Sequence, residues 1–286
     1  MTGLRIQKKA GRVEIDLDTL GNRSLGDLKQ LKGQYTGAVF IVTSGPSVND
    51  FPLERYAETP MIAVNGSIAC FPPSIEPLFF LCDDSSVASS KSDLVGSGLR
   101  RARFAGLGAS AMMRLAEQDA AALWESNLFL IERVNRWMDK PQLSDRSFAW
   151  RERHNSDYVI QHSLFSQKRS RIGFSRNFAA GYFSCRTIAY TAIQLACYLG
   201  FNRIIMVGMD LRSSLGNFYD PTGARERSRL DEDYEDLILP HFTWMAKRAL
   251  GPDFQVFNLS LNSRLPVEVL PKISLAELDE ILGRKQ

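Results

Sequence analysis

Small polar residues follow an apolar segment early in the chain, and their types suit the binding of a phosphate group. Residues 38–42 read AVFIV, and after Thr43 come Ser44, Gly45, Pro46 and Ser47. A glycine in a tight turn lets backbone N–H groups approach an anion, and the positive end of a following helix favours that anion. The spacing matches neither a dinucleotide-binding glycine fingerprint nor a P-loop. Two interpretations therefore stay open, a phosphate-binding turn and an ordinary connection in which Ser47 caps a helix.

A second apolar segment also ends in polar residues. Residues 61–64 read MIAV, and Asn65 and Gly66 follow. A side-chain amide both donates and accepts hydrogen bonds, so Asn65 is suited to a base or a ribose edge. The alternative is an asparagine turn with no ligand.

Two adjacent carboxylates follow a third apolar segment. Residues 77–82 read PLFFLC, and Asp83 and Asp84 come next. Such residues bind Mg²⁺, cap a helix or hold a ribose hydroxyl. Because neighbouring side chains tend to diverge, we expect a metal site made by both carboxylates to be the less favoured of these options.

Three residues in the C-terminal half have side chains suited to catalysis. Asp210 ends the segment IIMVGMD, and Thr187 or Arg212 are candidate partners for its carboxylate; a structural salt bridge is the alternative. Tyr219 is placed to donate to a leaving phosphate. His241 lies among apolar residues, so it is either a core histidine or a general base with a pKa suited to neutral pH. His154 and His162 are rival bases.

Positive charge is concentrated in one segment. Residues 146–176 hold seven arginines and lysines, including Arg171 and Arg176, against two acidic residues. The resulting local charge of +5 exceeds the +3 of the whole chain. Aromatic residues are interleaved with these cations. The segment suits phosphorylated sugars, an anionic membrane surface or nucleic acid, and a solvated basic loop is the alternative.

The elements that must position these residues follow a regular order. Strands are predicted at 38–42, 61–64, 77–82, 128–131, 203–210 and 254–259. Helices are predicted at 109–124, 183–199, 233–249 with a kink or start at Pro240, and 274–283. Apolar strands that end in small polar residues are typical of a parallel α/β sheet, where ligands gather at the carboxyl ends of the strands.

The remaining segments complete the predicted domain organisation. Residues 1–37 form an N-terminal arm with one edge strand and a short helix, and residues 38–286 form a single Rossmann-like domain. Residues 138–178 lack clear periodicity, so we expect an inserted lid or acceptor-binding subdomain there.

Composition limits the class of protein. The chain has 286 residues, 44% of them hydrophobic, which excludes global disorder. Its longest apolar stretches are far shorter than the roughly 20 residues that span a bilayer, and the N-terminus lacks the apolar core of a secretory signal. Its four cysteines lie in apolar neighbourhoods without CxxC spacing, which favours reduced core thiols in a cytoplasmic protein.

Taken together, these motifs resemble a known group of enzymes. The pattern consists of an apolar strand ending in SGPS, Asn65 at the next strand end, the segment YLGFNRIIMVGMD and a late strand ending in NLSLNS. It is similar to the bacterial sialyltransferases of the Campylobacter type and to the related DUF115-like group. It resembles most narrowly the WaaZ-type transferases of 3-deoxy-octulosonate (Kdo) to the lipopolysaccharide core. The resemblance covers about residues 38–85 and 183–263.

The resemblance implies a GT-A-like Rossmann fold, a CMP-activated sugar acid as donor, and inversion without an essential metal. It implies nucleotide contacts from the turn at 44–47, from Asn65 and from Thr187, and it assigns the strand-end acid to Asp210. Asp83 and Asp84 replace the family's asparagine after the third strand. Arg212 replaces one tyrosine of the leaving-phosphate site, and Tyr219 takes the role of the other. The family's histidine base aligns near Asp236, five residues before His241.

Three functions are compatible with these observations. The first is an inverting glycosyltransferase that moves Kdo or a sialic-acid-like sugar from CMP to the lipopolysaccharide core, peripheral on the inner membrane. In it His241, Tyr219 and Asp210 are catalytic, and Arg171, Arg176 and Arg212 bind phosphate or acceptor. The second is a Mg²⁺-dependent pterin diphosphokinase, as in a DUF115 branch, with Asp83, Asp84 and Asp210 as ligands. The third is a non-enzymatic module that binds anionic ligands.

Overall fold

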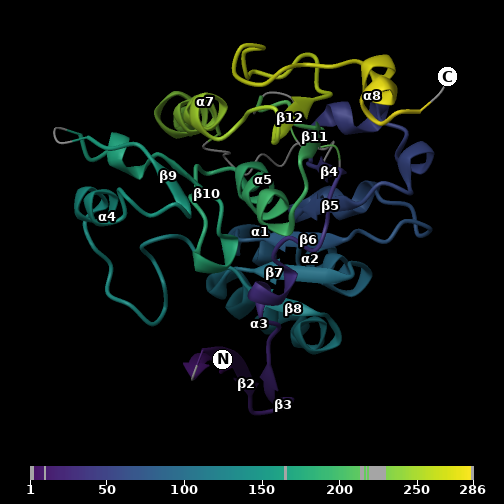
Figure 1. The fold of residues 1–286 in the computed structure, drawn as a ribbon. Helices are drawn as coiled ribbons and strands as arrows, with labels where there is room; N and C mark the ends of the chain where they lie inside the picture. The colour runs from purple at the N-terminus through teal and green to yellow at the C-terminus, as the bar shows by residue number, and fades with distance from the viewer. Residues whose placement is uncertain are drawn as a thin grey trace.

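A seven-stranded parallel sheet forms the centre of the molecule in the computed structural model, which describes residues 3–9, 11–163, 166–212, 216, 218 and 230–284 (Figure 1). Its strands, in sheet order, are β12 (Gln255–Asn258), β11 (Arg203–Val207), β4 (Ala38–Val42), β5 (Met61–Val64), β6 (Phe79–Cys82), β7 (Phe104–Leu107) and β8 (Leu128–Leu130). Every neighbouring pair is parallel. The α/β class and the parallel sheet predicted from the sequence are therefore confirmed.

The order of the strands reverses between β4 and β11. From β4 the chain adds β5, β6, β7 and β8 on one side, and it then returns to add β11 and β12 on the other side. The connections on the two sides of this point leave the sheet in opposite directions and open a crevice at the carboxyl ends of β4 and β11. The topology therefore predicts a ligand site at the residues that follow these two strands.

Strand β7 was not predicted from the sequence. It reads FAGL, and alanine and glycine are depleted in strands. Gly106 is needed for packing, because a Cβ there would lie 2.8 Å from Leu81 Cδ2 and 2.9 Å from Ile131 Cγ2. Close packing between neighbouring strands, which no local pattern reveals, selects these small residues.

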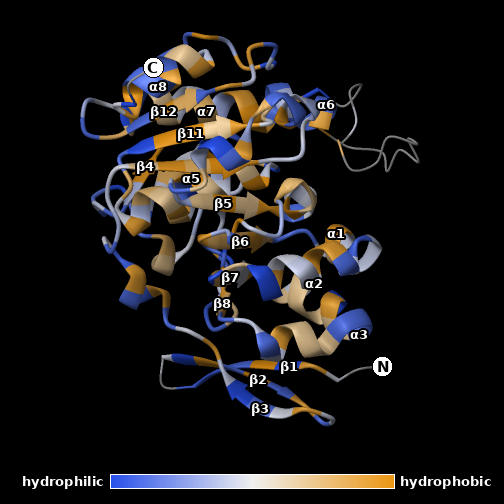
Figure 2. Ribbon diagram, turned by 90° about the vertical axis from the view of Figure 1, so that its right-hand side faces the viewer, coloured by the Kyte–Doolittle hydropathy of each residue, from blue (hydrophilic) through white to orange (hydrophobic). Residues whose placement is uncertain are grey.

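Helices cover both faces of the sheet (Figures 1 and 2). On one face pack α1 (Ser85–Ser90), α2 (Ser92–Arg101), α3 (Ala109–Glu125) and α8 (Leu275–Ile281). On the other pack α5 (Ile188–Leu199) and α7 (Leu239–Arg248). Short 3₁₀ helices follow the first two strands of the sheet, at η2 (Pro46–Asp50), η3 (Leu53–Tyr56) and η4 (Asn65–Cys70). Because both faces are covered, the strands are apolar on both sides, as the sequence predicted.

Helix α5 begins five residues later than the sequence predicted. The backbone N–H of Phe183 donates to the Gln194 side chain at 2.9 Å, and the Gln194 amide donates back to the Phe183 carbonyl at 2.9 Å. Arg186 then has a φ of +70°, which an α-helix excludes, and Thr187 is the N-cap. The apolar composition of 183–187 therefore reflects burial against the helix rather than helix formation.

The N-terminal segment contains more sheet than expected. In place of one strand, it forms an antiparallel sheet of β1 (Arg5–Lys9), β2 (Arg12–Leu17) and β3 (Gly21–Ser24), and the expected short helix follows as the 3₁₀ helix η1 (Leu28–Leu31). This sheet lies at the β8 end of the molecule in Figure 2. Lys8 pairs with Glu132 and lies 3.2 Å from Asp139, which links the sheet to the loop after β8.

The basic segment has its own regular structure and an apolar side. It contains α4 (Asp145–Arg151), β9 (Tyr158–Ile160), η5 (Arg169–Arg171) and β10 (Gly173–Ser175), with β9 and β10 antiparallel, and η6 (Phe178–Ala180) follows it. Phe148, Phe174 and Phe178 are buried in the core, whereas Trp150 is 58% exposed. Most of the interleaved aromatic side chains that are described thus hold the segment against the sheet and do not form a stacking surface.

The helical segment before β12 contains a π-helical turn. Helix α6 (Leu230–Asp233) leads into this turn at Tyr234–Ile238, which leads into α7. The N–H of Leu239 donates to the carbonyl of Tyr234, five residues earlier. Pro240 has no N–H to donate, so the wider turn accommodates it at the start of α7, close to the predicted position. In the part of the chain that the structure describes, no helix combines the length and apolar character needed to cross a membrane.

Candidate functional site

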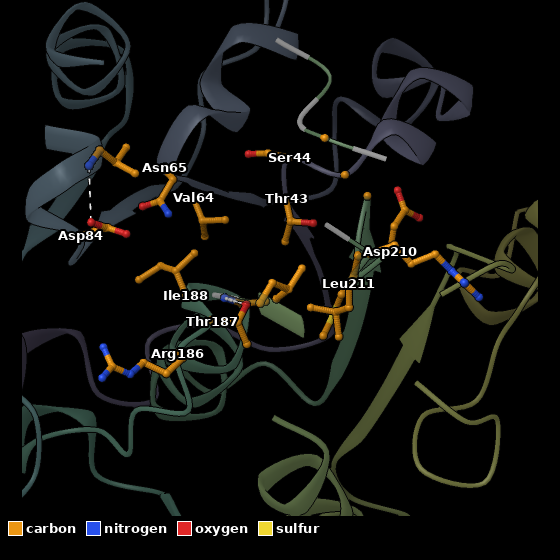
Figure 3. Close-up of a pocket in the computed structure, with 18 of the residues that line it drawn as sticks. Thr43, Ser44, Val64, Asn65, Asp84, Arg186, Thr187, Ile188, Asp210 and Leu211 are labelled. Atoms are coloured by element: carbon orange, nitrogen blue, oxygen red, sulfur yellow. Dashed lines mark hydrogen bonds between the residues drawn. The ribbon is translucent and has the colours of Figure 1, made fainter. Parts of the chain in front are cut away.

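A cavity of about 530 Å³ opens at the carboxyl ends of the strands, at the point where the strand order reverses. We call it the strand-end cavity. Its wall is formed by the loops after β4, β5, β6 and β11 together with the start of α5 and residues of α6 (Figure 3). The predicted site residues that line it are Ser44, Gly45, Pro46, Asn65, Asp84, Thr187, Asp210 and Arg212. The structure thus brings together residues that are up to 168 positions apart in the sequence.

Asp210 joins the loops after β4 and β11. Its carboxylate accepts a hydrogen bond from the backbone N–H of Ser47 at 2.9 Å, in the first turn of η2. In the described residues this N–H is the observed partner, in place of the expected Thr187 or Arg212. Ser47 also shares a hydrogen bond of 2.7 Å with Ser260 and does not line the strand-end cavity. A protein carboxylate therefore occupies the position that a phosphate was predicted to take at Ser47.

Gly45 allows this close approach. A Cβ at this position would lie 2.2 Å from the carbonyl oxygen of Gly208 and 2.5 Å from Asp210 Oδ2. The N–H of Gly45 donates to the same carbonyl at 2.9 Å. The sequence suggested that this glycine lets a ligand come close to the backbone. In the structure it lets the loop after β11 come close, and Gly45 lines the cavity together with Ser44 and Pro46.

Asn65 has an unpaired amide oxygen. The residue has a φ of +48°, a conformation that asparagine tolerates better than most residues. Its Oδ1 is buried and has no hydrogen-bond partner, and the residue lines the strand-end cavity. A buried oxygen without a partner is costly, which favours a ligand donor at this position. Gly66 is buried and does not line the cavity.

The two adjacent carboxylates diverge, as expected. Asp83 pairs with Arg133, at 2.6 Å to Nη2, and accepts from the hydroxyl of Tyr182. Burial, and then the charge of Asp83, raise the pKa of Tyr182 well above its ordinary value, so this hydroxyl stays a donor. Asp84 caps α1 by accepting from Ser86 N at 2.9 Å, and it lines the cavity. Only Asp84 of the two is open to a ligand there.

The start of α5 faces the cavity from below in Figure 3, with Arg186, Thr187 and Ile188. Thr187 Oγ1 accepts from Ala189 N at 3.4 Å as the N-cap. The guanidinium of Arg186 lies 4.0 Å from Asp233, which also lines the cavity. Sequence reasoning missed Arg186 and Asp233. A cation directly before the N-cap of an apolar helix is a signal that could have identified Arg186.

The other predicted cations are dispersed. Arg212 lines the strand-end cavity and donates to the carbonyl of Asn262 at 3.0 Å. Arg171 pairs with Asp145 at 2.5 Å and lines a different, smaller cavity. Arg176 is exposed and lines neither cavity.

The structure does not bring His241 to the strand-end cavity. Its side chain is fully buried, with its ring 5.5 Å from that of Tyr190, and its Nδ1 is 2.7 Å from the carbonyl oxygen of Leu237. Burial lowers the pKa of His241 to about 4. This environment is that of a neutral core histidine. Tyr219 lies outside the described residues.

The magnesium alternative would require Asp83, Asp84 and Asp210 to share one ion. Asp83 instead pairs with Arg133, and Asp210 caps η2. Within the described residues, no group of three or more histidine, cysteine, aspartate or glutamate side chains is placed to hold a metal. The structure therefore offers no support for the proposed magnesium ligands.

Comparison with known proteins places the chain in a family. A probable 3-deoxy-manno-octulosonic acid transferase of Salmonella typhimurium is 31% identical over 257 residues, which cover 89% of this chain and 93% of that protein. A probable 3-deoxy-manno-octulosonic acid transferase of Escherichia coli is 27% identical over 249 residues, 87% of this chain and 86% of that protein. No solved structure matches. Residues 23–276 match the family described as 3-deoxy-D-manno-octulosonic acid transferase WaaZ, and the chain therefore belongs to the WaaZ family of Kdo transferases.

Proposed function

We propose that this protein is an inverting glycosyltransferase that moves Kdo from CMP to a sugar of the lipopolysaccharide core. The names of the family and of the relatives describe a Kdo transferase, which supports the transferase activity. We assign the sugar donor to the strand-end cavity. The observation that carries the proposal is the unpaired amide oxygen of Asn65 in this cavity. The exocyclic amino group of cytosine is a donor that would satisfy it.

The phosphate of the donor would lie at the start of α5. Backbone N–H groups and the positive end of the helix dipole favour an anion there, and the Arg186 guanidinium adds a full charge. Arg212 faces the same cavity from the loop after β11. These cations stabilise the charge that develops on the leaving CMP, so the proposal assigns no resident metal.

The reaction also needs a base. The acceptor hydroxyl attacks the anomeric carbon, the bond from that carbon to the CMP oxygen breaks with its electron pair, and the hydroxyl proton moves to the base. Among the described carboxylates of the cavity, Asp84 caps α1 and Asp210 caps η2. For Asp233, the contact found among the described residues is the 4.0 Å approach of Arg186. We assign the base to Asp233 in place of His241.

Calorimetric titration with CMP tests the donor site. We expect wild-type protein to bind CMP, and the Asn65→Ala variant to bind it about tenfold or more weakly, because one hydrogen bond to a buried group is lost. UMP, which presents an acceptor where CMP presents an amino group, is expected to bind weakly to both. Equal affinity of wild type and Asn65→Ala for CMP would contradict the assignment of the donor site to this cavity.

Replacement of Asp233 tests the base. We expect Asp233→Asn to lower kcat by about 10²–10⁴-fold with an unchanged affinity for CMP. The matched control is Asp236→Asn, which removes a carboxylate on the same helical segment that pairs with Lys168 at the surface. Unaltered kcat in Asp233→Asn would exclude this residue as the base.

The basic segment and the acceptor suggest where the protein acts. The exposed Trp150, with the guanidinium of Arg153 4.3 Å from its ring centroid, lies on α4 and its C-terminal turn. An exposed aromatic ring beside arginines suits an anionic membrane surface. We propose peripheral association with the cytoplasmic face of the inner membrane, where the lipid-linked acceptor is available.

A further inference from the structure

We propose that a second cavity beside the strand-end cavity binds an anionic group of the acceptor sugar through Arg136 and Arg186. This inference rests on the proposed function, because it places the acceptor of that reaction. The cavity has a volume of about 160 Å³ and lies between the loop after β8, the α4–η5 region and the segment before α5. We call it the arginine cavity, after Arg133, Arg136, Arg171 and Arg186 in its wall.

Two of the four guanidinium groups in this cavity are engaged by carboxylates. Arg133 is paired with Asp83 at 2.6 Å, and Arg171 is paired with Asp145 at 2.5 Å. These pairs hold the wall together and leave little charge for a ligand.

The other two guanidinium groups are available. In the described part of the chain, no side-chain partner of Arg136 is found, and the residue is exposed. Arg186 has the distant contact of 4.0 Å with Asp233, and its side chain is 58% exposed. The planar fork of a guanidinium binds a carboxylate or a phosphate through two parallel hydrogen bonds. Both remaining cations are therefore suited to a ligand anion.

The loop that carries Arg136 is held rigidly. Asn135 has a φ of +59°, and its side chain accepts from Leu143 N at 2.9 Å and donates to Leu143 O at 2.8 Å. One residue earlier, Val134 N donates to the carbonyl of Tyr182 at 3.0 Å. A fixed backbone on both sides of the cavity lowers the conformational cost of ordering Arg136 on a ligand.

The position of the cavity suits an acceptor. Arg186 lines both cavities, so a sugar bound by Arg136 and Arg186 lies next to the donor phosphate site. Phe148 and Phe183 add apolar surface to the wall, which suits the face of a sugar ring. The charge selects an acidic sugar over a neutral one, and both a sugar carboxylate and a sugar phosphate have the required chemistry.

Saturation-transfer NMR titrations test the arginine cavity in the full chain with the strand-end cavity saturated by CMP. The probes are the methyl glycoside of Kdo, which carries a carboxylate, glucose 6-phosphate, and neutral methyl mannoside. We expect one or both anionic probes to bind and the neutral probe to bind about tenfold or more weakly. The anion that binds more tightly identifies the group recognised. Equal binding of all three probes, or anionic probes that bind only when CMP is left out, would overturn the proposal.

A pair of variants locates the binding. We expect Arg136→Gln to weaken the anionic probe by about tenfold or more, and to raise the acceptor KM in a transfer assay while the donor KM is unchanged. Arg114→Gln, which removes an exposed arginine of α3 outside both cavities, is the control and should behave as wild type. Equal probe affinity in the two variants would refute the assignment. If wild-type protein did not bind CMP, that result would refute the proposed donor site, whatever the sugar probes show.

Discussion

At the scale of single residues, the strand ends contain two kinds of polar group that look alike in the sequence. Asp83 and Asp210 are buried or nearly so and bind other parts of the protein, Arg133 in one case and Ser47 N in the other. Asn65 keeps a buried oxygen without a partner at the cavity. Because a buried polar group without a partner is costly, this difference separates residues that maintain the site from a residue that awaits a ligand.

The packing at Gly45 leads to a prediction about stability. We expect Gly45→Ala to lower the free energy of unfolding by about 2 kcal/mol or more, because its Cβ would displace the Gly208 carbonyl or the Asp210 carboxylate. The backbone at Gly45 has a φ of −67°, so the effect is steric and not conformational. Gly251→Ala is the control, with nothing within 4 Å of the added methyl group. Urea unfolding that shows equal stability for the two variants would contradict the predicted clash.

His241 predicts a pH dependence of stability. Its pKa is about 4 in the folded chain, against an ordinary 6.5, because burial disfavours the charged ring. The unfolded chain therefore binds more protons than the folded chain between these values, so stability is lost as the pH falls from 6.5 toward 4. The full contribution is about 3 kcal/mol.

Urea unfolding of wild type and His241→Phe at pH 7 and pH 5 checks this contribution. We expect wild type to lose more stability than the variant over this interval, because the variant has no ring proton to gain. His154→Gln, which changes a histidine in the basic segment, should keep the wild-type dependence. If the free energy of unfolding changed equally with pH in wild type and His241→Phe, His241 would not be the cause of the pH dependence.

At the scale of elements, the start of α5 connects the fold to the proposed chemistry. Gln194 inside the helix binds the backbone of Phe183, and Arg186 then takes a left-handed conformation directly before the cap. That conformation costs of order 1 kcal/mol or more in a residue other than glycine. Arg186 lines both cavities, which suggests that the strained backbone serves to direct its guanidinium toward the proposed ligands.

Replacement of Arg186 by asparagine tests this interpretation. Asparagine tolerates a positive φ, so we expect Arg186→Asn to leave the free energy of unfolding unchanged or to raise it by up to about 1 kcal/mol. At the same time we expect a weaker affinity for CMP, because the charge at the donor phosphate is lost. Thermal unfolding and calorimetry on the same preparation measure both effects. Lower stability with unchanged CMP affinity would assign Arg186 a purely structural role.

At the scale of the whole molecule, the reversal of strand order brings the site together. The loops after β4 and β11 are hydrogen-bonded to each other there, and the start of α5 forms part of the wall of the same cavity. The basic segment packs Phe148 and Phe174 into the core on the same face as α5. Residues of the basic segment line the arginine cavity, which shares Arg186 with the strand-end cavity, so an acceptor bound there would lie next to the proposed donor site.

The sequence by itself determined much of this fold. Continuous apolar runs with polar ends predicted all of the central strands except β7, and the parallel arrangement explains why Ser44, Asn65 and Asp84 meet at one edge. The helix predicted at 274–283 is α8, and a capping box of Ser274 and Glu277 begins it. These features are local, because burial on both faces and the end of a strand or helix are each specified by a few neighbouring residues.

Only the tertiary structure decided which of these side chains remain available to a ligand. The pairing of Asp83 with Arg133, of Asp210 with Ser47, and the burial of His241 against Tyr190 each join residues at least 50 positions apart. The approach of Asp233, the proposed base, to Arg186 joins residues 47 positions apart. A residue type states what chemistry is available, but the partners supplied by packing determine whether that chemistry is used inside the protein or offered to a substrate.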